Sequence, residues 1–219
     1  MSTRYRWFAA FAAALGWFTL ALKLLLSIRM TQAMGQGALA GVWLYLGFYT
    51  VLTNMLVALA LTAGSTGPRG PITRFFGRPG VNTAIAMSIA VVGVIYSLLL
   101  RHLWNPQGWQ LFADIMVHDA MPPIFLLYWW LAVPKWSLRW QHIVLWQAYP
   151  VGYFAYVLAR GALIGRYPYP FLDVNTLGYA RVVGNACLVL LAFVAVALVL
   201  VALARWQVRR ATREVVQAA

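Results

Sequence analysis

The sequence predicts an all-α protein of the membrane, a polytopic single bundle of six transmembrane helices with the N- and C-termini cytoplasmic. Apolar residues make up 63% of the 219 positions and charged residues only 10%, whereas a soluble domain carries roughly a quarter charged residues. So few charges could not cover a water-exposed surface, so a bilayer is the expected solvent. Six apolar segments reach spanning length, at 7–29, 38–63, 81–101, 109–133, 141–164 and 181–204.

The first segment follows Arg4 and Arg6, an arrangement that also occurs in secretory signal peptides. Its apolar run extends from Trp7 to Ile28, which is longer than a signal-peptide core of about 7–15 residues. We therefore expect this segment to remain on the chain as the first membrane span. No second domain is expected, so 1–219 is treated as one transmembrane domain.

Basic residues are distributed unequally between the two sides of the predicted bundle. The side that carries both termini holds Arg4, Arg6, Arg69, Arg74, Arg78, Lys135, Arg139, Arg205, Arg209, Arg210 and Arg213. The opposite side holds Arg29, Arg101, Arg166 and Arg181. Because Lys and Arg accumulate in cytoplasmic loops, this asymmetry indicates that both termini are inside. Arginine far outnumbers lysine and alanine is abundant, a composition typical of GC-rich bacteria, so the expected location is a bacterial plasma membrane.

Several classes of function are disfavoured by the composition. The net charge of +13 could suggest a nucleic-acid partner, but the basic residues flank apolar runs as juxtamembrane anchors do. Cys187 is the single cysteine, so an intrachain disulfide is impossible. His102, His118 and His142 fall at different levels of the predicted bundle and show no ligand spacing. The sequence therefore predicts no metal, no cofactor and no nucleic-acid partner.

Thr50, Thr53 and Asn54 form a polar group inside the second predicted helix. Their i, i+3 and i+4 spacing places them on one helix face. A polar side chain at membrane depth is costly, so each needs a partner or a function. Hydrogen bonding between helices is the common explanation for Thr and Asn in membranes, and the spacing alone favours it over catalysis.

Asp114 and His118 form a second polar pair, four residues apart on one face of the fourth predicted helix. A carboxylate in this position could hold the imidazole in one tautomer, as in a nucleophile–base–orienter arrangement. A simple hydrogen-bonded pair near a helix mouth is the alternative. Pro122 and Pro123 follow, and we expect them to kink the helix and open a pocket beside the histidine.

Three stretches occur in a fixed order along the chain: FYTVLTN at 48–54, His118 followed by Pro122 and Pro123, and YPYPFLD at 167–173. Together they resemble segments of the androgen-induced and androgen-dependent integral membrane hydrolases and their bacterial six-helix relatives. By segment order the resemblance covers most of the chain.

The proline-rich stretch at 167–173 is interpreted as a rigid lid in preference to a gate for lipid entry.

The resemblance implies an intramembrane lipid ester hydrolase that acts on fatty-acid esters of hydroxy fatty acids or similar lipids. It places a threonine nucleophile at Thr50 and a histidine base at His118, with Thr53 as the alternative nucleophile one turn later. The expected partner is a lipid substrate within the bilayer.

Further roles follow from the chemistry of ester attack. Asp114 is expected to orient the histidine ring, while Tyr49 and Pro122 are expected to contact the substrate. Asn54, Tyr49 and backbone N–H groups near Pro122 are the candidate donors to the developing oxyanion.

The competing hypothesis is a non-catalytic membrane protein with a lipid-binding, transport or assembly role. Interhelical hydrogen bonds would explain the buried threonines and asparagine without any chemistry. Transport is the least favoured of these roles, because the sequence contains neither an evident internal repeat nor several charged pore residues.

Overall fold

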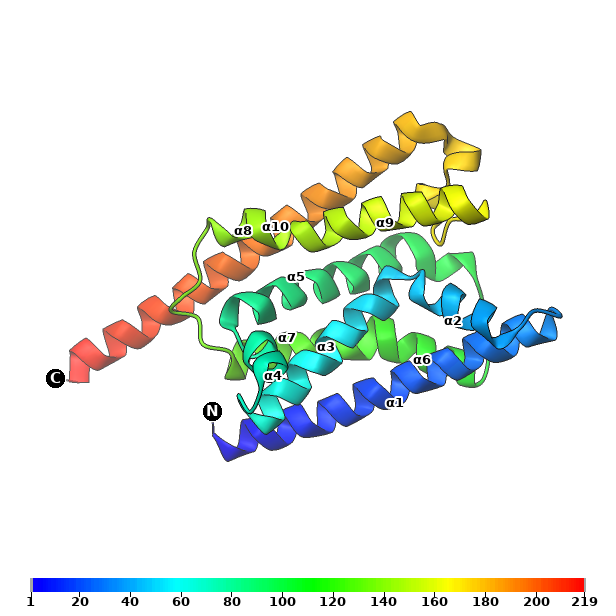
Figure 1. Ribbon diagram of the computed structural model, residues 1–219. Coiled ribbons are helices and arrows are strands. Elements are labelled where there is room, and N and C mark those ends of the chain that lie inside the picture. The colour runs from blue at the N-terminus through cyan, green and yellow to red at the C-terminus, as the bar shows by residue number, and fades with distance from the viewer. Residues whose placement is uncertain (1, 219) are drawn as a thin grey trace. The chain divides into compact units, whose positions relative to one another are not determined.

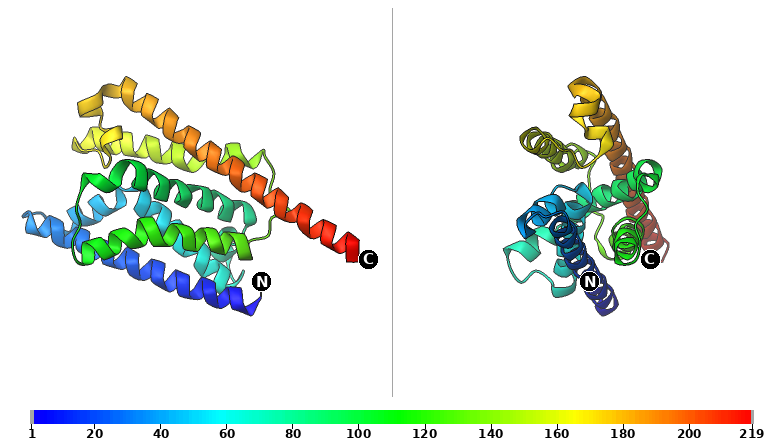
Figure 2. Two further views of the ribbon diagram at one scale, coloured as in Figure 1. Left: turned by 180° about the vertical axis from the view of Figure 1, so that it is seen from behind. Right: turned by 90° about the vertical axis from the view of Figure 1, so that its right-hand side faces the viewer.

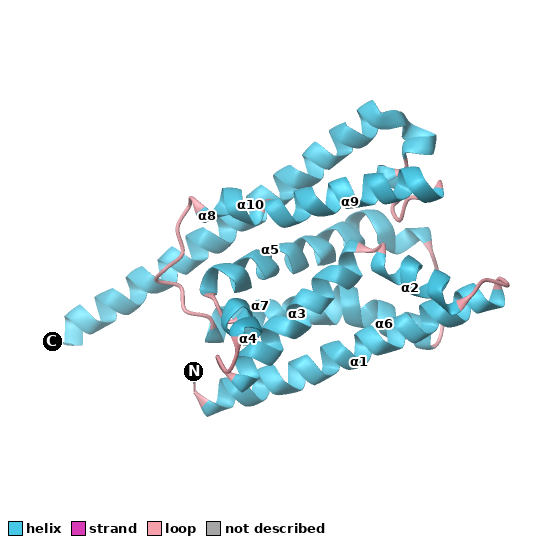
Figure 3. Ribbon diagram, viewed as in Figure 1, coloured by secondary structure: helices cyan, strands magenta, loops and turns pink. Residues whose placement is uncertain are grey.

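The computed structural model describes residues 2–218, and the side chains of residues 2–214. Every regular element in this range is a helix, and short loops join the helices (Figure 3). Five of the helices in the described range are long and apolar enough to cross a membrane, judged by length and composition. The all-α class and the presence of several apolar helices of spanning length are thereby confirmed.

The chain divides into two compact units, Met1–Pro134 and Lys135–Ala219. The α-helices of the first unit are α1 (Thr3–Ala33), α2 (Ala38–Leu46), α3 (Tyr49–Thr66), α4 (Pro71–Phe76), α5 (Pro79–Ile95), α6 (Trp109–Ile115) and α7 (Met121–Ala132). Two π-helical turns (Tyr96–Leu100 and Met116–Ala120) and one 3₁₀ turn (Arg101–Leu103) complete it. The helices of the second unit are α8 (His142–Trp146), α9 (Ala148–Ile164), a 3₁₀ turn (Pro170–Leu172) and α10 (Val174–Ala218).

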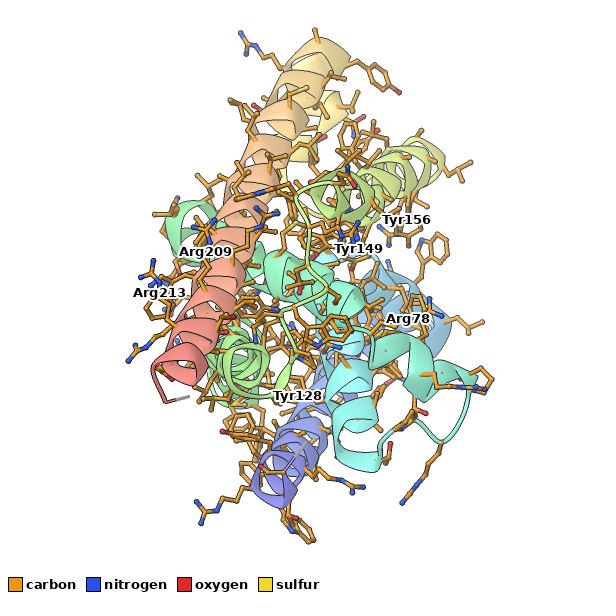
Figure 4. The ribbon with its side chains drawn as sticks, turned by 90° about the vertical axis from the view of Figure 1, so that its left-hand side faces the viewer. Arg78, Tyr128, Tyr149, Tyr156, Arg209 and Arg213 are labelled. Carbon is orange, nitrogen blue, oxygen red and sulfur yellow. The ribbon has the colours of Figure 1, made fainter. Side chains whose placement is uncertain are left out.

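Within the first unit, α1 lies along α3, and α5 packs against both α3 and α7 (Figures 1 and 2). Small residues allow the close approaches. A Cβ at Gly16 of α1 would lie 3.2 Å from Cε of Met121, which is tighter than an ordinary contact, and a Cβ at Gly64 of α3 would lie 2.2 Å from the hydroxyl of Tyr128. Figure 4 labels Tyr128. Small residues at helix contacts are usual in membranes, where dispersion forces between closely packed backbones drive association.

The second predicted helix, 38–63, is interrupted. Phe48 is extended, with φ −93° and ψ 128°, so that α2 ends before it and α3 begins directly after it. Gly47 precedes this break, and a glycine in a helix interior costs roughly 0.5–1 kcal/mol relative to alanine. As a result Thr50 lies in the first turn of a helix, where the sequence had placed it in the middle of one.

The fourth predicted helix, 109–133, is distorted near its prolines. The N–H of Met121 bonds to the carbonyl of Met116, five residues back, which closes a π-helical turn between α6 and α7. Pro122 and Pro123 have no N–H, so the regular ladder cannot continue through them. The distortion that the prolines predicted is therefore present, as a wide turn that contains His118.

In the second unit, the fifth predicted segment forms α8 and α9, of which α9 has 17 residues. The last predicted segment, 181–204, lies inside the longer α10, which contains a non-helical residue at Gly178 (φ 72°). Arg209 and Arg213, labelled in Figure 4, lie near the C-terminal end of α10.

The proline-rich stretch at 167–173 is held by contacts within the second unit. The Tyr167 ring packs so closely over Gly161 of α9 that a Cβ there would lie 2.0 Å from the ring. The amide nitrogen of Asn185 donates to the carbonyl of Phe171 at 2.9 Å. These contacts tie the stretch to α9 and α10.

The contact between α1 and α2 supplies a test of the packing. Gly41→Ala would put a Cβ 2.5 Å from the Cα of Ile28, and because this neighbour is backbone it cannot move aside cheaply. We expect a loss of about 1–3 kcal/mol of stability, measured as a lower thermal unfolding midpoint in detergent. The matched control is Gly184→Ala on α10, where a Cβ meets nothing within 4 Å and the unfolding midpoint should hold or rise. Equal midpoints for the two variants would contradict the close approach.

Candidate functional site

The side chains of Thr50 and His118, the two residues predicted to react, are in contact. The Oγ1 atom of Thr50, in the first turn of α3, lies 3.3 Å from Nε2 of His118, in the π-helical turn between α6 and α7. Thr50 is 8% exposed and the His118 side chain 10%, so the contact is shielded from solvent but not sealed. A hydroxyl and an imidazole that lie 68 positions apart in the chain thus form a pair in the first unit.

The other nitrogen of the His118 ring determines which of the two groups donates. Nδ1 lies 3.0 Å from the backbone carbonyl oxygen of Asp114, and a carbonyl can only accept a hydrogen bond. Nδ1 therefore carries the proton in the neutral ring, and Nε2 has a free lone pair. It follows that the Thr50 hydroxyl donates to Nε2, which is the direction needed for a base to take the hydroxyl proton.

The carboxylate of Asp114 lies beside the same nitrogen, as its i, i+4 spacing predicted. Its Oδ1 atom is 3.3 Å from Nδ1 of His118, and the Asp114 side chain is 3% exposed. A buried carboxylate next to a ring N–H favours the tautomer that the carbonyl already selects and would stabilise a positive charge on the ring.

Tyr96 is a member of the site that the sequence argument missed. Its hydroxyl donates to Oδ2 of Asp114, and its ring stacks on the His118 ring with centroids 3.7 Å apart and planes 7° apart. Tyr96 lies in an apolar run, and the only signal in the sequence was that a buried tyrosine hydroxyl usually has a hydrogen-bond partner. Which partner it takes depends on how the π-helical turn Tyr96–Leu100 is placed beside Asp114 and His118.

Three further charged residues lie near this group. Nη1 of Arg101 donates to Oδ2 of Asp119 at 3.3 Å, and its guanidinium carbon lies 4.9 Å from the centroid of the Tyr96 ring. This ion pair joins the 3₁₀ turn Arg101–Leu103 to the π-helical turn that contains His118. The ammonium nitrogen of Lys23, on α1, lies 6.0 Å from the centroid of the Trp104 ring.

Asn54 joins α3 to the π-helical turn. Its amide nitrogen donates to the carbonyl of Thr50 at 2.8 Å and to the carbonyl of Val117 at 3.2 Å. Within its own helix the Val117 carbonyl lacks a donor, because the N–H of Met121 bonds to Met116 and Pro122 has no N–H. Asn54 supplies the missing donor. Since both of its N–H groups are engaged, donation to an oxyanion would require Asn54 to release one of these carbonyls.

The remaining predicted residues lie close by. Thr53 is fully buried one turn after Thr50, and Tyr49 is the buried first residue of α3. Pro122 faces α5: a Cβ at Gly93 would lie 3.5 Å from its ring and 3.3 Å from the His118 carbonyl oxygen. Gly93 was not singled out in the sequence, yet its lack of a side chain lets α5 approach the π-helical turn.

Comparisons of the chain with protein-family models, with curated proteins and with solved structures find no significant match. Among the described residues, no group of three or more His, Cys, Asp or Glu side chains is arranged to hold a metal ion. A function for the chain therefore has to be inferred from the chemistry of the site itself.

The bridge made by Asn54 can be tested without any activity assay. Asn54→Leu would leave the Val117 carbonyl buried and unpaired, which costs about 1–3 kcal/mol. We expect faster hydrogen–deuterium exchange of backbone amides in 113–121. Asn82→Leu is the matched control, because Asn82 also donates to two carbonyls, of Phe76 and Arg78, but at the start of α5. Faster exchange in 113–121 for both variants, or for neither, would argue against a local bridge.

Proposed function

We propose that this chain is an intramembrane lipid ester hydrolase in which Thr50 is the nucleophile and His118 the general base. The observation that carries the proposal is the contact of Thr50 Oγ1 with His118 Nε2 at 3.3 Å, with Nδ1 held by the Asp114 carbonyl. A threonine hydroxyl is a poor nucleophile until a base removes its proton. A neutral imidazole with its acceptor nitrogen within hydrogen-bond reach is such a base.

The reaction would proceed in two halves. In the first, Thr50 Oγ1 attacks the ester carbonyl carbon while its proton moves to Nε2, and the resulting imidazolium protonates the departing alkoxide, which leaves as an alcohol. In the second, a water molecule gives a proton to Nε2 and attacks the acyl-threonine. The carboxylic acid then leaves, and the proton returns from Nε2 to Thr50. The carboxylate of Asp114, 3.3 Å from Nδ1, would stabilise the imidazolium in both halves.

The start of α3 offers a donor for the oxyanion. The N–H groups of a first helical turn have no carbonyl one turn earlier in the same helix, and the helix dipole is positive at this end. Thr50 is the second residue of α3, while the N–H groups of Val51 and Leu52 bond to the Phe48 carbonyl. The backbone N–H of Thr50 is therefore the donor that we favour, in place of the already engaged amide of Asn54.

The membrane setting supports a lipid substrate. Both residues of the pair lie on segments of spanning length, Tyr49–Thr66 and Trp109–Ala132. An ester at this depth would be surrounded by acyl chains, and the motif resemblance to hydrolases of fatty-acid esters of hydroxy fatty acids points to the same class. The proposed reaction uses neither a cofactor nor a metal ion.

We also propose that α9 is the sixth span, which completes a six-span chain. Its 17 residues reach the lower end of the range of about 17–25 residues for a transmembrane helix. With six spans the two termini share a side, and the excess of arginine beside both termini supports a cytoplasmic location in a bacterial plasma membrane.

Turnover of purified protein tests the catalytic assignment. With a fatty-acid ester of a hydroxy fatty acid in mixed micelles, Thr50→Ala and His118→Ala should each lower kcat by at least about 100-fold, because each removes a group that moves the reacting proton. Thr66→Ala is the matched control, since its hydroxyl bonds only within the last turns of α3.

The outcome at Thr53 separates the two candidate nucleophiles. Loss of turnover in Thr53→Ala with retention in Thr50→Ala would move the nucleophile one turn along α3. The non-catalytic alternative would instead be favoured by two results together. The parent protein would cleave no ester, and Thr50→Val would lower the thermal unfolding midpoint.

A further inference from the structure

We propose that Tyr96 is a positioning residue that holds the Asp114 carboxylate and the His118 ring in the orientation that aims Nε2 at Thr50. The inference rests on the proposed function for its catalytic meaning. Tyr96 makes two separate contacts, a hydrogen bond from its hydroxyl to Asp114 Oδ2 and a face-to-face stack on the His118 ring. Each contact restrains a different rotation.

The hydroxyl restrains the carboxylate. The two oxygens of Asp114 face different neighbours: Oδ2 accepts from the Tyr96 hydroxyl, and Oδ1 lies 3.3 Å from Nδ1 of His118. The contact of Oδ1 with the ring nitrogen is long, so the hydrogen bond from Tyr96 to Oδ2 is the closer of the two restraints on the carboxylate. Without the hydroxyl the carboxylate could turn about its terminal torsion, which has a broad energy minimum.

The ring restrains the imidazole. With the planes 7° apart and the centroids 3.7 Å apart, the His118 ring cannot rotate out of its plane without striking the phenol ring. The phenol ring is held in turn, because Arg101 lies 4.9 Å from its centroid and is anchored by Asp119, the residue after His118. The stack and the ion pair therefore join the same two neighbouring segments of the chain.

Both turns are π-helical. Tyr96 begins the turn Tyr96–Leu100, and His118 lies in the middle of the turn Met116–Ala120. A π-helical turn inserts one extra residue into a helix and changes the direction of the side chains around it, and such turns occur frequently at functional sites. The stack of Tyr96 on His118 joins these two π-helical turns.

Two substitutions separate the contacts. Tyr96→Phe keeps the stacked ring and removes the hydroxyl, whereas Tyr96→Leu removes both. The matched control is Tyr45→Phe: Tyr45 is also buried in the first unit, and its hydroxyl donates to the Leu20 carbonyl at 3.1 Å, without contact to the His118 ring. The control also loses the hydrogen bond of a buried tyrosine hydroxyl, here to a neutral carbonyl, so it reports the effect of lost stability away from the His118 ring.

The readout is the tautomer of His118, observed by NMR of the full chain with ¹⁵N-labelled histidine in detergent micelles. The protein has three histidines, so His102→Gln and His142→Asn leave His118 as the only signal, and asparagine keeps an acceptor for the N–H of Arg139. The chemical shifts of the two ring nitrogens distinguish the Nδ1–H form from the Nε2–H form of the neutral ring.

The parent protein should show the Nδ1–H form, as should Tyr45→Phe. Tyr96→Phe should show a mixture of the two forms. Its kcat should fall roughly 10- to 100-fold with little change in KM, because Nε2 is no longer oriented toward Thr50 while the substrate site is intact. Tyr96→Leu should show a larger loss. Identical ring spectra and rates for Tyr96→Phe and Tyr45→Phe would overturn the proposal.

The two proposals fail differently. If the parent cleaves no ester but the His118 spectrum responds to Tyr96→Phe and not to Tyr45→Phe, the positioning holds and the hydrolase assignment falls. If Thr50-dependent hydrolysis is present and Tyr96→Phe leaves both spectrum and rate unchanged, the hydrolase stands and the positioning is rejected.

Discussion

The hydrogen bond between the ring N–H of His118 and the backbone carbonyl of Asp114 is the interaction on which the site depends. A carbonyl has no proton to give, so Nδ1 is the donor and Nε2 the acceptor for as long as the ring keeps the orientation that brings Nδ1 to this carbonyl. The Thr50 hydroxyl must then donate to the ring. Had the tautomer been reversed, the same two side chains would touch with a proton on the wrong nitrogen, and the histidine could not act as a base.

Irregular backbone creates the conditions for this interaction. Phe48 is extended, so a new helix begins just before Thr50. The prolines that follow His118 are accompanied by a π-helical turn that contains His118. Each irregularity leaves backbone groups unpaired, which is tolerated at membrane depth only where the protein itself satisfies them. Asn54 does so for the Val117 carbonyl, and in the same step it ties the two irregular segments together.

The polar residues around His118 consequently form one connected group. Asn54 joins α3 to the turn of His118, Asp114 joins that turn to Tyr96, and Arg101 with Asp119 closes the connection. In a low-dielectric environment an unpaired member of such a group is costly, so each hydrogen bond within it restrains the side chains that it joins. Restraint of Thr50 and His118 is what the proposed reaction requires, since small misplacements lower a rate strongly.

The sequence by itself determined the features that depend on local spacing and composition. Runs of about 20 apolar residues predicted helices of spanning length, and i, i+4 spacing correctly placed Asp114 beside His118 and Asn54 beside Thr50, because residues four apart share a helix face. The break at Phe48 and the exact form of the turn at Met116–Ala120 were missed. Only the tertiary structure decided that Thr50 meets His118 and that Tyr96 and Arg101 complete the group. These contacts join residues far apart in the chain, and their partners are selected by how the helices pack and by where each helix is interrupted.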